Sequence, residues 1–118
     1  MNVLLAEDSF ANALMAKKLL EKLGCQVDHV ENGRLAADRA KSITYNLILM
    51  DLQMPVLDGY QSTEEIRNAG VSAPIIALTA SATDDEQKRI VEYGMNGFLL
   101  KPVTMDGLNE IIVKWVTK

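Results

Sequence analysis

The fold of this chain is decided by one stretch of sequence, Leu47-Ile48-Leu49-Met50-Asp51-Leu52-Gln53-Met54-Pro55. Four apolar residues run directly into the carboxylate of Asp51, and a turn-like segment that ends at Asp58-Gly59 follows. A short continuous apolar run is typical of a strand buried on both faces of a parallel sheet, and Met-Pro and Asp-Gly pairs are typical of loops. The pattern therefore predicts that Asp51 lies at the carboxyl end of a central strand, where ligands bind in open α/β sheets.

Composition limits the classes of protein to which the chain can belong. Its 118 residues suffice for one domain with one sizeable core, and we expect a single domain over residues 1–118. An apolar content of 48% and a charged content of 24% are typical of a soluble globular domain. The net charge of −4, without a Lys/Arg cluster, argues against nucleic acid as a partner.

The location of the chain is predicted from three further features of the sequence. No apolar run approaches the roughly 20 residues needed to span a membrane, so we expect no membrane contact. No signal peptide is visible, because the apolar run at residues 3–6 is short and leads directly into two acidic residues. The single cysteine, Cys25, cannot form an internal disulfide. Together these features favour the reducing cytoplasm.

Short apolar runs alternate with segments of helical periodicity along the whole chain. The runs predict strands at residues 3–6, 26–30, 47–50, 74–78 and 97–100. The periodic segments predict helices over 10–23 and 35–40, and then from Ser62 to Gly70, Thr83 to Gly94 and Thr104 to Trp115. Ser62-x-x-Glu65 and Thr83-x-x-Glu86 resemble capping boxes at two of the helix starts. In the first helix the apolar residues at helical spacing include Phe10 and Leu14.

This alternation predicts an α/β fold with a parallel sheet and helices on both of its faces. The strand at 26–30 alternates polar and apolar residues, which indicates a partly solvated strand at an edge. The handedness of crossover connections limits the remaining topologies. The flavodoxin-like, doubly wound five-stranded sheet with order 2-1-3-4-5 satisfies these conditions and places the first and third strands side by side.

The carboxyl ends of four predicted strands carry polar residues of unusual chemistry. Glu7 and Asp8 follow the first strand, Asp51 the third, Thr79 the fourth and Lys101 the fifth. These ends lie on one edge of a parallel sheet, so three carboxylates, one hydroxyl and one ammonium converge there. Neighbouring carboxylates raise one another's pKa values unless a cation joins them, and hard oxygen ligands suit Mg²⁺. A nucleophile, a metal and charge-neutralising donors are what phosphoryl transfer needs.

The motifs resemble the receiver domain of two-component response regulators over essentially the whole chain. The resemblance rests on Glu7-Asp8, Asp51 with Met54-Pro55 and Asp58-Gly59, Ala77-Leu78-Thr79-Ala80, and Lys101-Pro102. Within this family, the chain particularly resembles the receivers of hybrid histidine kinases. The residues that carry this closer resemblance are Ala6-Glu7-Asp8-Ser9, Asn12, Gln53-Met54-Pro55 and Gly94-Met95-Asn96-Gly97. Leu35 and Asn96 depart from the Glu and Asp that are frequent in the family, but both lie outside the expected phosphate site.

The resemblance implies that Asp51 takes a phosphoryl group from phosphohistidine on a histidine kinase or a histidine phosphotransfer protein. It implies that Asp8, Asp51 and the backbone carbonyl of Gln53 ligate Mg²⁺, with Glu7 acting through water and Mn²⁺ as an alternative ion. Lys101 would pair with the phosphoryl oxygens. Beyond self-phosphorylation and autodephosphorylation no enzymatic activity is expected of this domain, although a longer parent protein could be a histidine kinase.

The resemblance also implies a response to phosphorylation. The Thr79 hydroxyl would move toward the phosphoryl group, and Phe98 would rotate inward to fill the vacated space. The surface formed by the fourth helix, the fifth strand and the fifth helix would then change its preference for partners. The residues expected to flank the site are Met54, Ala80, Ser81 and Pro102. Asp58 is interpreted as turn chemistry together with Gly59.

Other functions fit parts of the pattern. A phosphohydrolase with an aspartyl nucleophile would carry a second Asp two residues later, where this chain has Gln53. A nucleotide or flavin carrier would need phosphate-binding glycines or hydroxyls after the first strand, where this chain has Glu7-Asp8. A degenerate receiver would act as a scaffold without phosphorylation. We favour a receiver of a hybrid histidine kinase over a free-standing regulator, as a monomer or a weak homodimer.

Overall fold

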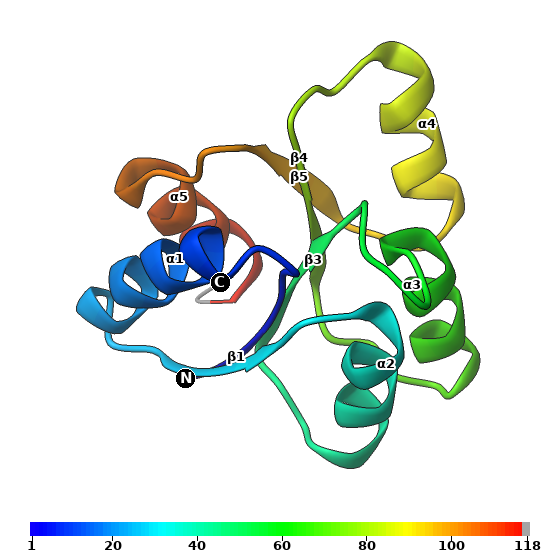
Figure 1. Ribbon diagram of the computed structural model, residues 1–118, viewed down its shortest axis with the longest axis horizontal. Coiled ribbons are helices and arrows are strands. Elements are labelled where there is room, and N and C mark those ends of the chain that lie inside the picture. The colour runs from blue at the N-terminus through cyan, green and yellow to red at the C-terminus, as the bar shows by residue number, and fades with distance from the viewer. Residues whose placement is uncertain (117–118) are drawn as a thin grey trace.

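The computed structural model describes residues 1–116 of the chain. Strands and helices alternate throughout these residues (Figure 1). The strands are β1 (Asn2–Ala6), β2 (Gln26–Val30), β3 (Leu47–Asp51), β4 (Ile75–Thr79) and β5 (Gly97–Leu100). The helices are α1 (Phe10–Lys22), α2 (Gly33–Ser42), α3 (Gly59–Asn68), α4 (Asp84–Glu92) and α5 (Met105–Trp115). This element order confirms the predicted alternation of strands and helices.

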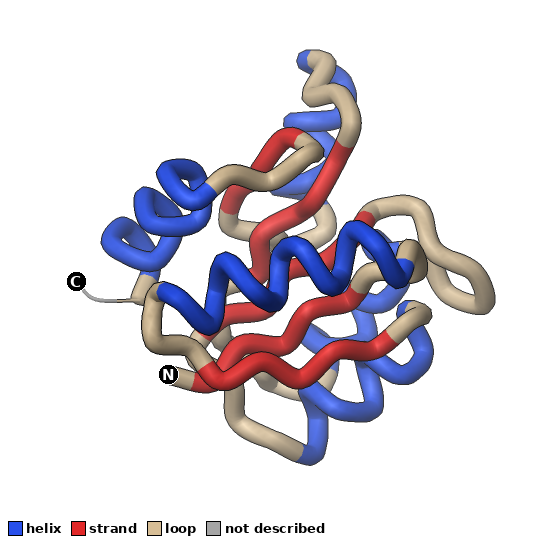
Figure 2. The backbone as a smooth tube through the Cα atoms, turned by 60° about the vertical axis from the view of Figure 1, so that its left-hand side comes forward, coloured by secondary structure: helices blue, strands red, loops and turns tan. Residues whose placement is uncertain are grey.

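The strands form one parallel sheet in the order β2-β1-β3-β4-β5, as the sequence predicts. Helices α1 and α5 cover one face, and α2, α3 and α4 cover the other (Figure 1). Figure 2 shows the strands lying side by side between these helical layers. The order of the chain across the sheet reverses between β1 and β3, which is the position where such sheets bind ligands.

Each face of the sheet has its own apolar core because successive side chains of a strand point to opposite faces. In β3, Ile48 and Met50 pack in the core beneath α2, α3 and α4. Leu47 and Leu49 pack in the core beneath α1 and α5. All five residues of β3 are buried, so the continuous apolar run identified in the sequence is a central strand covered on both faces.

Strand β2 lies at an edge of the sheet, which explains its alternating sequence. It pairs only with β1 among the described strands, and just one of its residues, Val30, is fully buried. Its polar side chains find partners at the margin of the domain. The Tyr45 hydroxyl donates to Asp28 at 2.6 Å, and Arg39 approaches the same carboxylate at 3.7 Å.

Helix α1 begins after Ser9, whose side chain accepts a hydrogen bond from the backbone N–H of Asn12. Small residues and one leucine form the buried face of the helix: Ala13, Ala16 and Leu20. Two residues of its apolar pattern do not belong to this face, because Phe10 is 75% exposed and Leu14 is 43% exposed. No helix within residues 1–116 has the length and apolar character needed to cross a membrane.

Helix α3 begins earlier than the sequence predicts. Asp58 is its N-cap and forms a reciprocal capping box with Gln61, so the predicted box at Ser62 is wrong. Ser62 lies inside the helix, where its hydroxyl donates to the Gly33 carbonyl at 2.8 Å. Glu65 forms an ion pair with Arg34 of α2. Both side chains of the predicted box therefore bind α2 instead of capping their own helix.

Gly59 explains why α3 can start directly against the central strand. A Cβ atom at this position would lie 2.4 Å from the Asp51 carbonyl oxygen, closer than real Cβ atoms approach such a group. The absence of a side chain lets the first turn of α3 pack on the backbone at the end of β3. Asp58-Gly59 is thus the start of α3, with Asp58 as its N-cap, where the sequence is interpreted as turn chemistry.

Helices α2 and α4 also differ from their predicted forms. Helix α2 extends over Gly33–Ser42, longer than the predicted 35–40, because the Asn32 side chain caps it by accepting from Leu35 N–H. Helix α4 is capped by Thr83, which accepts from the backbone N–H of Glu86. The second half of that predicted capping box is missing, since the Glu86 side chain contacts Thr79 instead.

Candidate functional site

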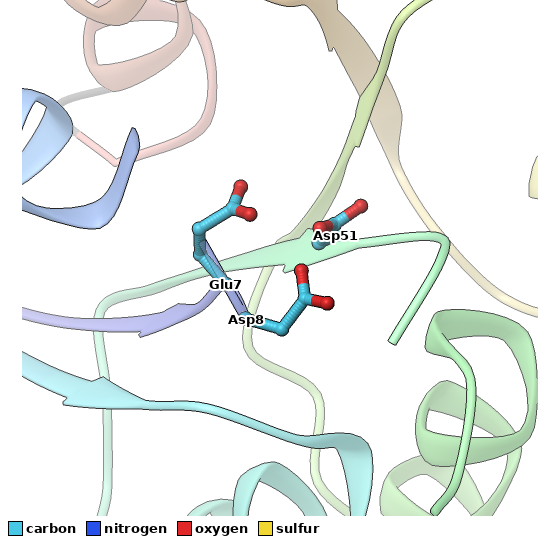
Figure 3. Close-up of side chains that lie close together, drawn as sticks. All are labelled: Glu7, Asp8 and Asp51. Atoms are coloured by element: carbon cyan, nitrogen blue, oxygen red, sulfur yellow. The ribbon is translucent and has the colours of Figure 1, made fainter. Parts of the chain in front are cut away.

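Three carboxylates meet where β1 and β3 end (Figure 3). Glu7 and Asp8 directly follow β1, and Asp51 is the last residue of β3. One oxygen atom from each of the three side chains lies within 4.8 Å of the others. We call these residues the carboxylate cluster. They come together because β1 and β3 pair in parallel with Ala6 opposite Met50, which brings the next residues of both strands to one edge.

The carboxylate cluster is unevenly exposed. Glu7 is 2% exposed and Asp51 is 3% exposed, whereas Asp8 faces solvent. The backbone N–H of Ser9 donates to Glu7 at 3.1 Å, and the backbone N–H of Gln53 donates to Asp51 at 3.1 Å. Two ionisable carboxyl groups are therefore held inside the protein with few hydrogen bonds, an arrangement that is costly unless positive charge is nearby.

Lys101 supplies one positive charge to the cluster. Its Nζ lies 3.0 Å from Asp51 and 3.3 Å from Glu7. Burial alone would lower the pKa of Lys101, but hydrogen bonds and charge attraction from Asp51 and Glu7 outweigh burial and raise this pKa. Lys101 is therefore a charged ammonium at neutral pH. The Lys101–Pro102 peptide bond that follows is cis.

The raised pKa of Glu7 shows that the single ammonium of Lys101 does not neutralise the negative charge of the carboxylate cluster. Burial is the main cause that raises the pKa of Glu7 from 4.5 to about 6. The Ser9 hydrogen bond lowers this pKa, the Asp51 charge raises it, and the Lys101 charge lowers it by less. Three carboxylates against one ammonium leave the site with excess negative charge. Because hard oxygen donors suit Mg²⁺, this donor set fits a divalent cation.

Thr79 lies at the end of β4, next to Asp51, but its hydroxyl points elsewhere. It contacts the carbonyl oxygen of Ser81 at 2.6 Å and the carboxylate of Glu86. The backbone N–H of Ser81 donates back to the Thr79 hydroxyl at 3.2 Å. Among residues 1–116, no hydrogen bond joins Thr79 to Asp51. Thr79 is therefore beside the carboxylate cluster without being engaged in it.

The other predicted residues occupy different positions around the site. Met54 is buried in the core near the loop that follows β3. Phe98 is half-buried on β5 and packs against the core under α2, α3 and α4. Pro102 is exposed directly after Lys101. Thus Phe98 and Met54 belong to the packed interior and not to the carboxylate cluster.

A cleft of about 470 Å³ opens between Asp51 and α4. Sequence reasoning placed several residues of its lining at the site, namely Asp51, Gln53, Thr79, Ala80, Ser81 and Lys101. It missed Tyr60, Glu86 and Arg89 in the same lining. Arg89 lies over the Tyr60 ring, 4.3 Å from the ring centroid. No sequence signal joins Tyr60 to Arg89, because they are brought together by the packing of α3 against α4.

Comparison with protein families gives a match over almost the entire chain. Residues 3–113 match the model of the response regulator receiver domain. The chain is also 39% identical, over 118 residues, to the sensor histidine kinase GacS of Pseudomonas protegens. That alignment covers 96% of this chain and 13% of the kinase, so the chain spans only a small part of this relative.

Solved structures of receiver domains share the fold. The receiver domain of the sensor histidine kinase PA1611 from Pseudomonas aeruginosa, with a magnesium ion coordinated in its active site cleft, superimposes with a TM-score of 0.91 at 39% identity. The alignment covers 99% of this chain and 98% of that domain.

The second structure contains a partner protein. It is the co-crystal structure of the Saccharomyces cerevisiae phosphotransfer protein Ypd1 with the receiver domain of Ssk1. It matches with a TM-score of 0.92 at 30% identity, over 99% of this chain and 89% of that chain. The sheet order, the polar strand ends and these matches lead to one conclusion: the chain belongs to the response regulator receiver domain family.

Proposed function

We propose that Asp51 is the phosphoryl acceptor of this receiver domain, and that the donor is phosphohistidine on a histidine kinase or a histidine phosphotransfer protein. One observation carries the proposal: Asp51 is buried at the end of the central strand, 3.0 Å from Lys101 and beside two more carboxylates. A buried carboxylate held by a fixed ammonium is a positioned nucleophile. Phosphotransfer systems of this kind also favour the cytoplasm as the location of the chain.

The proposed reaction makes one bond and breaks one bond. An oxygen of Asp51 attacks phosphorus as the phosphorus–nitrogen bond to the donor imidazole breaks, and the imidazole leaves with the bonding electron pair. The Asp51 oxygen attacks as a carboxylate, and Lys101 Nζ lies 3.0 Å from that carboxylate. Lys101 then balances negative charge on the phosphoryl oxygens, which is the main contribution that proteins make to phosphoryl transfer.

The carboxylate cluster fits a Mg²⁺ ion, and Mn²⁺ is an alternative with similar ligand preference. We propose that Asp8, Asp51 and the Gln53 carbonyl would hold the ion, with Glu7 acting through water. When bound, the ion neutralises charge between the carboxylates and the phosphoryl oxygens. Because Glu7 must be ionised to attract the ion and its water ligand, affinity for Mg²⁺ should fall as the pH is lowered through the pKa of Glu7 at about 6.

Phosphorylation would be transmitted by the residues around the cleft. We propose that Thr79 moves toward the phosphoryl group and that Phe98, half-buried on β5, turns inward. The position of Thr79 beside Asp51 supports this proposal, since parallel β3 and β4 pair with Leu78 opposite Asp51. The surface formed by α4, β5 and α5 would then change its preference for partners.

The donor protein must reach Asp51 from the edge of the sheet. Phe10 and Leu14 on α1 are exposed apolar side chains that follow Asp8 closely in the chain. We propose that they contact the donor protein. The negative net charge supports a protein partner and not nucleic acid, and we propose a monomer or a weak homodimer without membrane contact of its own.

We propose that this receiver domain belongs to a longer parent protein. The similarity to the receiver of PA1611 and to part of GacS supports an origin in a hybrid histidine kinase, which we prefer to a free-standing response regulator. The domain itself would carry out only self-phosphorylation and autodephosphorylation. Gln53 cannot supply the general acid of an aspartyl phosphohydrolase, which makes turnover of phosphate esters the less favoured function.

The test is intact mass spectrometry after incubation with Mg²⁺ and a small phosphodonor. The wild type should gain one phosphate, and Asp51→Asn should gain none, because an amide oxygen is a poor nucleophile. Asp106→Asn is the matched control, since Asp106 is an exposed aspartate in the first turn of α5, and it should label like the wild type.

The other functions predict different results in the same experiment. No adduct in a folded wild type would contradict the proposal and favour a scaffold. An adduct that persists in Asp51→Asn would place the acceptor elsewhere. Sustained release of phosphate from unrelated esters would favour a phosphohydrolase. Phosphotransfer from a phosphorylated donor protein should weaken in Phe10→Ser while labelling by the small phosphodonor stays the same, which tests the proposed docking surface separately.

A further inference from the structure

The contact between Glu86 and Thr79 has no part in the phosphoryl transfer described above. Glu86 lies in the first turn of α4, and its carboxylate accepts a hydrogen bond from the Thr79 hydroxyl across the β4–α4 loop. We infer that Glu86 is a positioning residue that holds the Thr79 hydroxyl away from Asp51 and so opposes the phosphorylated state. This inference rests on the proposed role of Thr79.

The capping of helix α4 is incomplete, because the Glu86 side chain is used elsewhere. Thr83 caps α4, and Glu86 is the third residue of the helix, where a glutamate normally reaches back to the N-cap backbone. The Thr83 hydroxyl does accept from Glu86 N–H at 3.1 Å. The Glu86 side chain does not return the hydrogen bond and instead contacts Thr79. Helix α4 therefore forgoes half of its capping box in favour of a contact with the site.

The Thr79 hydroxyl has fewer protons to donate than it has acceptors within reach. A threonine hydroxyl carries one hydrogen, so it can donate to only one acceptor at a time. Glu86 and the Ser81 carbonyl both lie within reach of it. Hydrogen bonds to an ionised carboxylate are stronger than those to a neutral carbonyl. The donor is thus committed to Glu86, and Thr79 must give up this bond before it can donate to a phosphoryl oxygen.

The surroundings of Glu86 determine how strongly its carboxylate holds Thr79. Within residues 1–116, Glu86 forms no salt bridge, and its carboxylate finds its hydrogen-bond donor in Thr79. The neighbouring cation, Arg89, lies instead over the rings of Tyr60 and Tyr93, at 4.3 Å and 5.9 Å. The half-buried Glu86 carboxylate therefore depends on Thr79, which makes the restraint a contact between two specific groups.

Glu86→Ala removes the restraint, and binding of beryllofluoride in the presence of Mg²⁺ measures the effect. Beryllofluoride mimics a phosphoryl group on a carboxylate, so it requires the state with Thr79 turned inward. By calorimetry, Glu86→Ala should bind it about tenfold more tightly than the wild type, the scale of one hydrogen bond to a charged group. Glu86→Gln keeps an acceptor of the same shape and should lie between the two.

A double-mutant cycle separates positioning from a change of charge. In a Thr79→Ala background, Glu86→Ala should no longer raise the affinity, because there is no hydroxyl to release. Asp84→Asn is the matched control: it removes one negative charge from the same turn of α4 and should change the affinity less than twofold. An equal gain in the Thr79→Ala background, an equal gain in Asp84→Asn, or a loss of affinity in Glu86→Ala would overturn the inference.

Failure of this inference and failure of the proposed function look different. If a folded wild type does not bind beryllofluoride at all, the phosphoryl-acceptor function itself is contradicted. If the wild type binds it but Glu86→Ala binds with the same affinity, the site works and Glu86 does not restrain it. Circular dichroism and thermal unfolding of each variant establish that the domain remains folded after the substitution.

Discussion

The two sides of Asp51 differ in how far they are prepared for a phosphoryl group. On one side, Lys101 already contacts the Asp51 carboxylate at 3.0 Å. On the other side, the Thr79 hydroxyl is bonded to Glu86 and Ser81 and must turn before it can reach the same place. The Lys101 half of the site is therefore preformed. The Thr79 half, which we call the withheld half, is held in contacts away from Asp51. The preformed half would support phosphorylation of Asp51. The withheld half would change its conformation in response to that phosphorylation.

The difference follows from the reach of the two side chains. Lys101 follows β5 and must extend past β4 to meet Asp51 at the end of β3, a span of roughly 10 Å at the usual spacing of neighbouring strands. The lysine side chain, the Asp51 side chain and the 3.0 Å contact between them together cover this span. Thr79 is on the adjacent strand, but its short side chain is controlled by the loop that carries Ser81 and by the start of α4.

The largest expected effect comes from breaking the preformed half. Lys101→Met should lower the free energy of unfolding by about 3 kcal/mol at pH 7, because it leaves Glu7 and Asp51 buried without their ammonium. The penalty should shrink at pH 5, below the pKa of Glu7 at about 6, where that carboxyl is protonated. Urea unfolding at both pH values in EDTA measures the change.

A surface lysine provides the control for this substitution. Lys88→Met removes an exposed lysine of α4 that forms no ion pair within the described part of the chain, and it should change stability by less than about 0.5 kcal/mol. If Lys101→Met proves no less stable than Lys88→Met at pH 7, the contacts of Lys101 with the cluster do not hold the preformed half together.

Glu7→Gln should change the free energy of unfolding by a smaller amount than Lys101→Met, and it should raise it. The folded protein raises the pKa of Glu7 from 4.5 to about 6, so it binds protons more readily than the unfolded chain. Stability is therefore lost as the pH rises through this window. The rise from 4.5 to about 6 corresponds to about 2 kcal/mol.

The amide in Glu7→Gln stays neutral, so the variant should avoid that loss. We expect it to be about 2 kcal/mol more stable than the wild type at pH 7.5 without metal, and similar to it near pH 4. Thermal unfolding across pH 4 to 8 in EDTA is the measurement. Equal stability of the two proteins at pH 7.5 would show that the cluster is electrostatically balanced without a metal.

The withheld half is tested by Thr79→Ala. This substitution should leave labelling of Asp51 possible, because Lys101 and the carboxylate cluster are untouched. Beryllofluoride should bind about tenfold more weakly to the Thr79→Ala, Glu86→Ala double variant than to Glu86→Ala, the scale of one lost charge-assisted hydrogen bond. The loss from the wild type to Thr79→Ala should be smaller, because the wild type first gives up the bond to Glu86. The partner preference of the α4, β5 and α5 surface should no longer respond to phosphorylation. Thr79→Ser restores the hydroxyl and should recover both properties; unchanged partner binding in Thr79→Ala would remove Thr79 from the response.

The smallest expected change in stability comes from Asp58, which belongs to neither half of the site. Asp58→Ala removes the N-cap of α3 and should cost about 1 kcal/mol of stability. Asp58→Asn keeps a capping oxygen and should cost only a fraction of that. Chemical unfolding measures both, and calorimetry with Mg²⁺ provides the second readout. A large loss of Mg²⁺ affinity in Asp58→Asn would give Asp58 a role in the carboxylate cluster, against its interpretation as a helix cap.

The sequence predicted the sheet well because its signals are local. The apolar run that ends at Asp51 is buried along its whole length, and the alternating strand Gln26–Val30 lies at an edge as expected. Strand ends in a parallel sheet share one edge, so the meeting of Glu7, Asp8 and Asp51 followed from strand order alone. These are consequences of periodicity and of topology, and neither depends on side-chain packing.

The failures of sequence reasoning have a common physical cause. Ser62 and Glu65 have the spacing of a capping box, but both bind α2 instead. Glu86 also has cap spacing, but its carboxylate contacts Thr79. In each case a polar side chain could satisfy a local partner or a distant one. Sequence spacing describes only the local choice, and the distant partner exists only after the helices have packed on the sheet.

The sequence by itself determined the alternation of strands and helices, the central strand before Asp51 and the order of polar groups along the sheet edge. The tertiary structure alone decided which of those groups touch. It placed Lys101 on Asp51 and Glu7, turned Thr79 toward Glu86, and left Phe10 exposed. The physical reason is that backbone periodicity is fixed by neighbours in the chain. Hydrogen bonds and ion pairs depend on distances between side chains, which only the packed fold establishes.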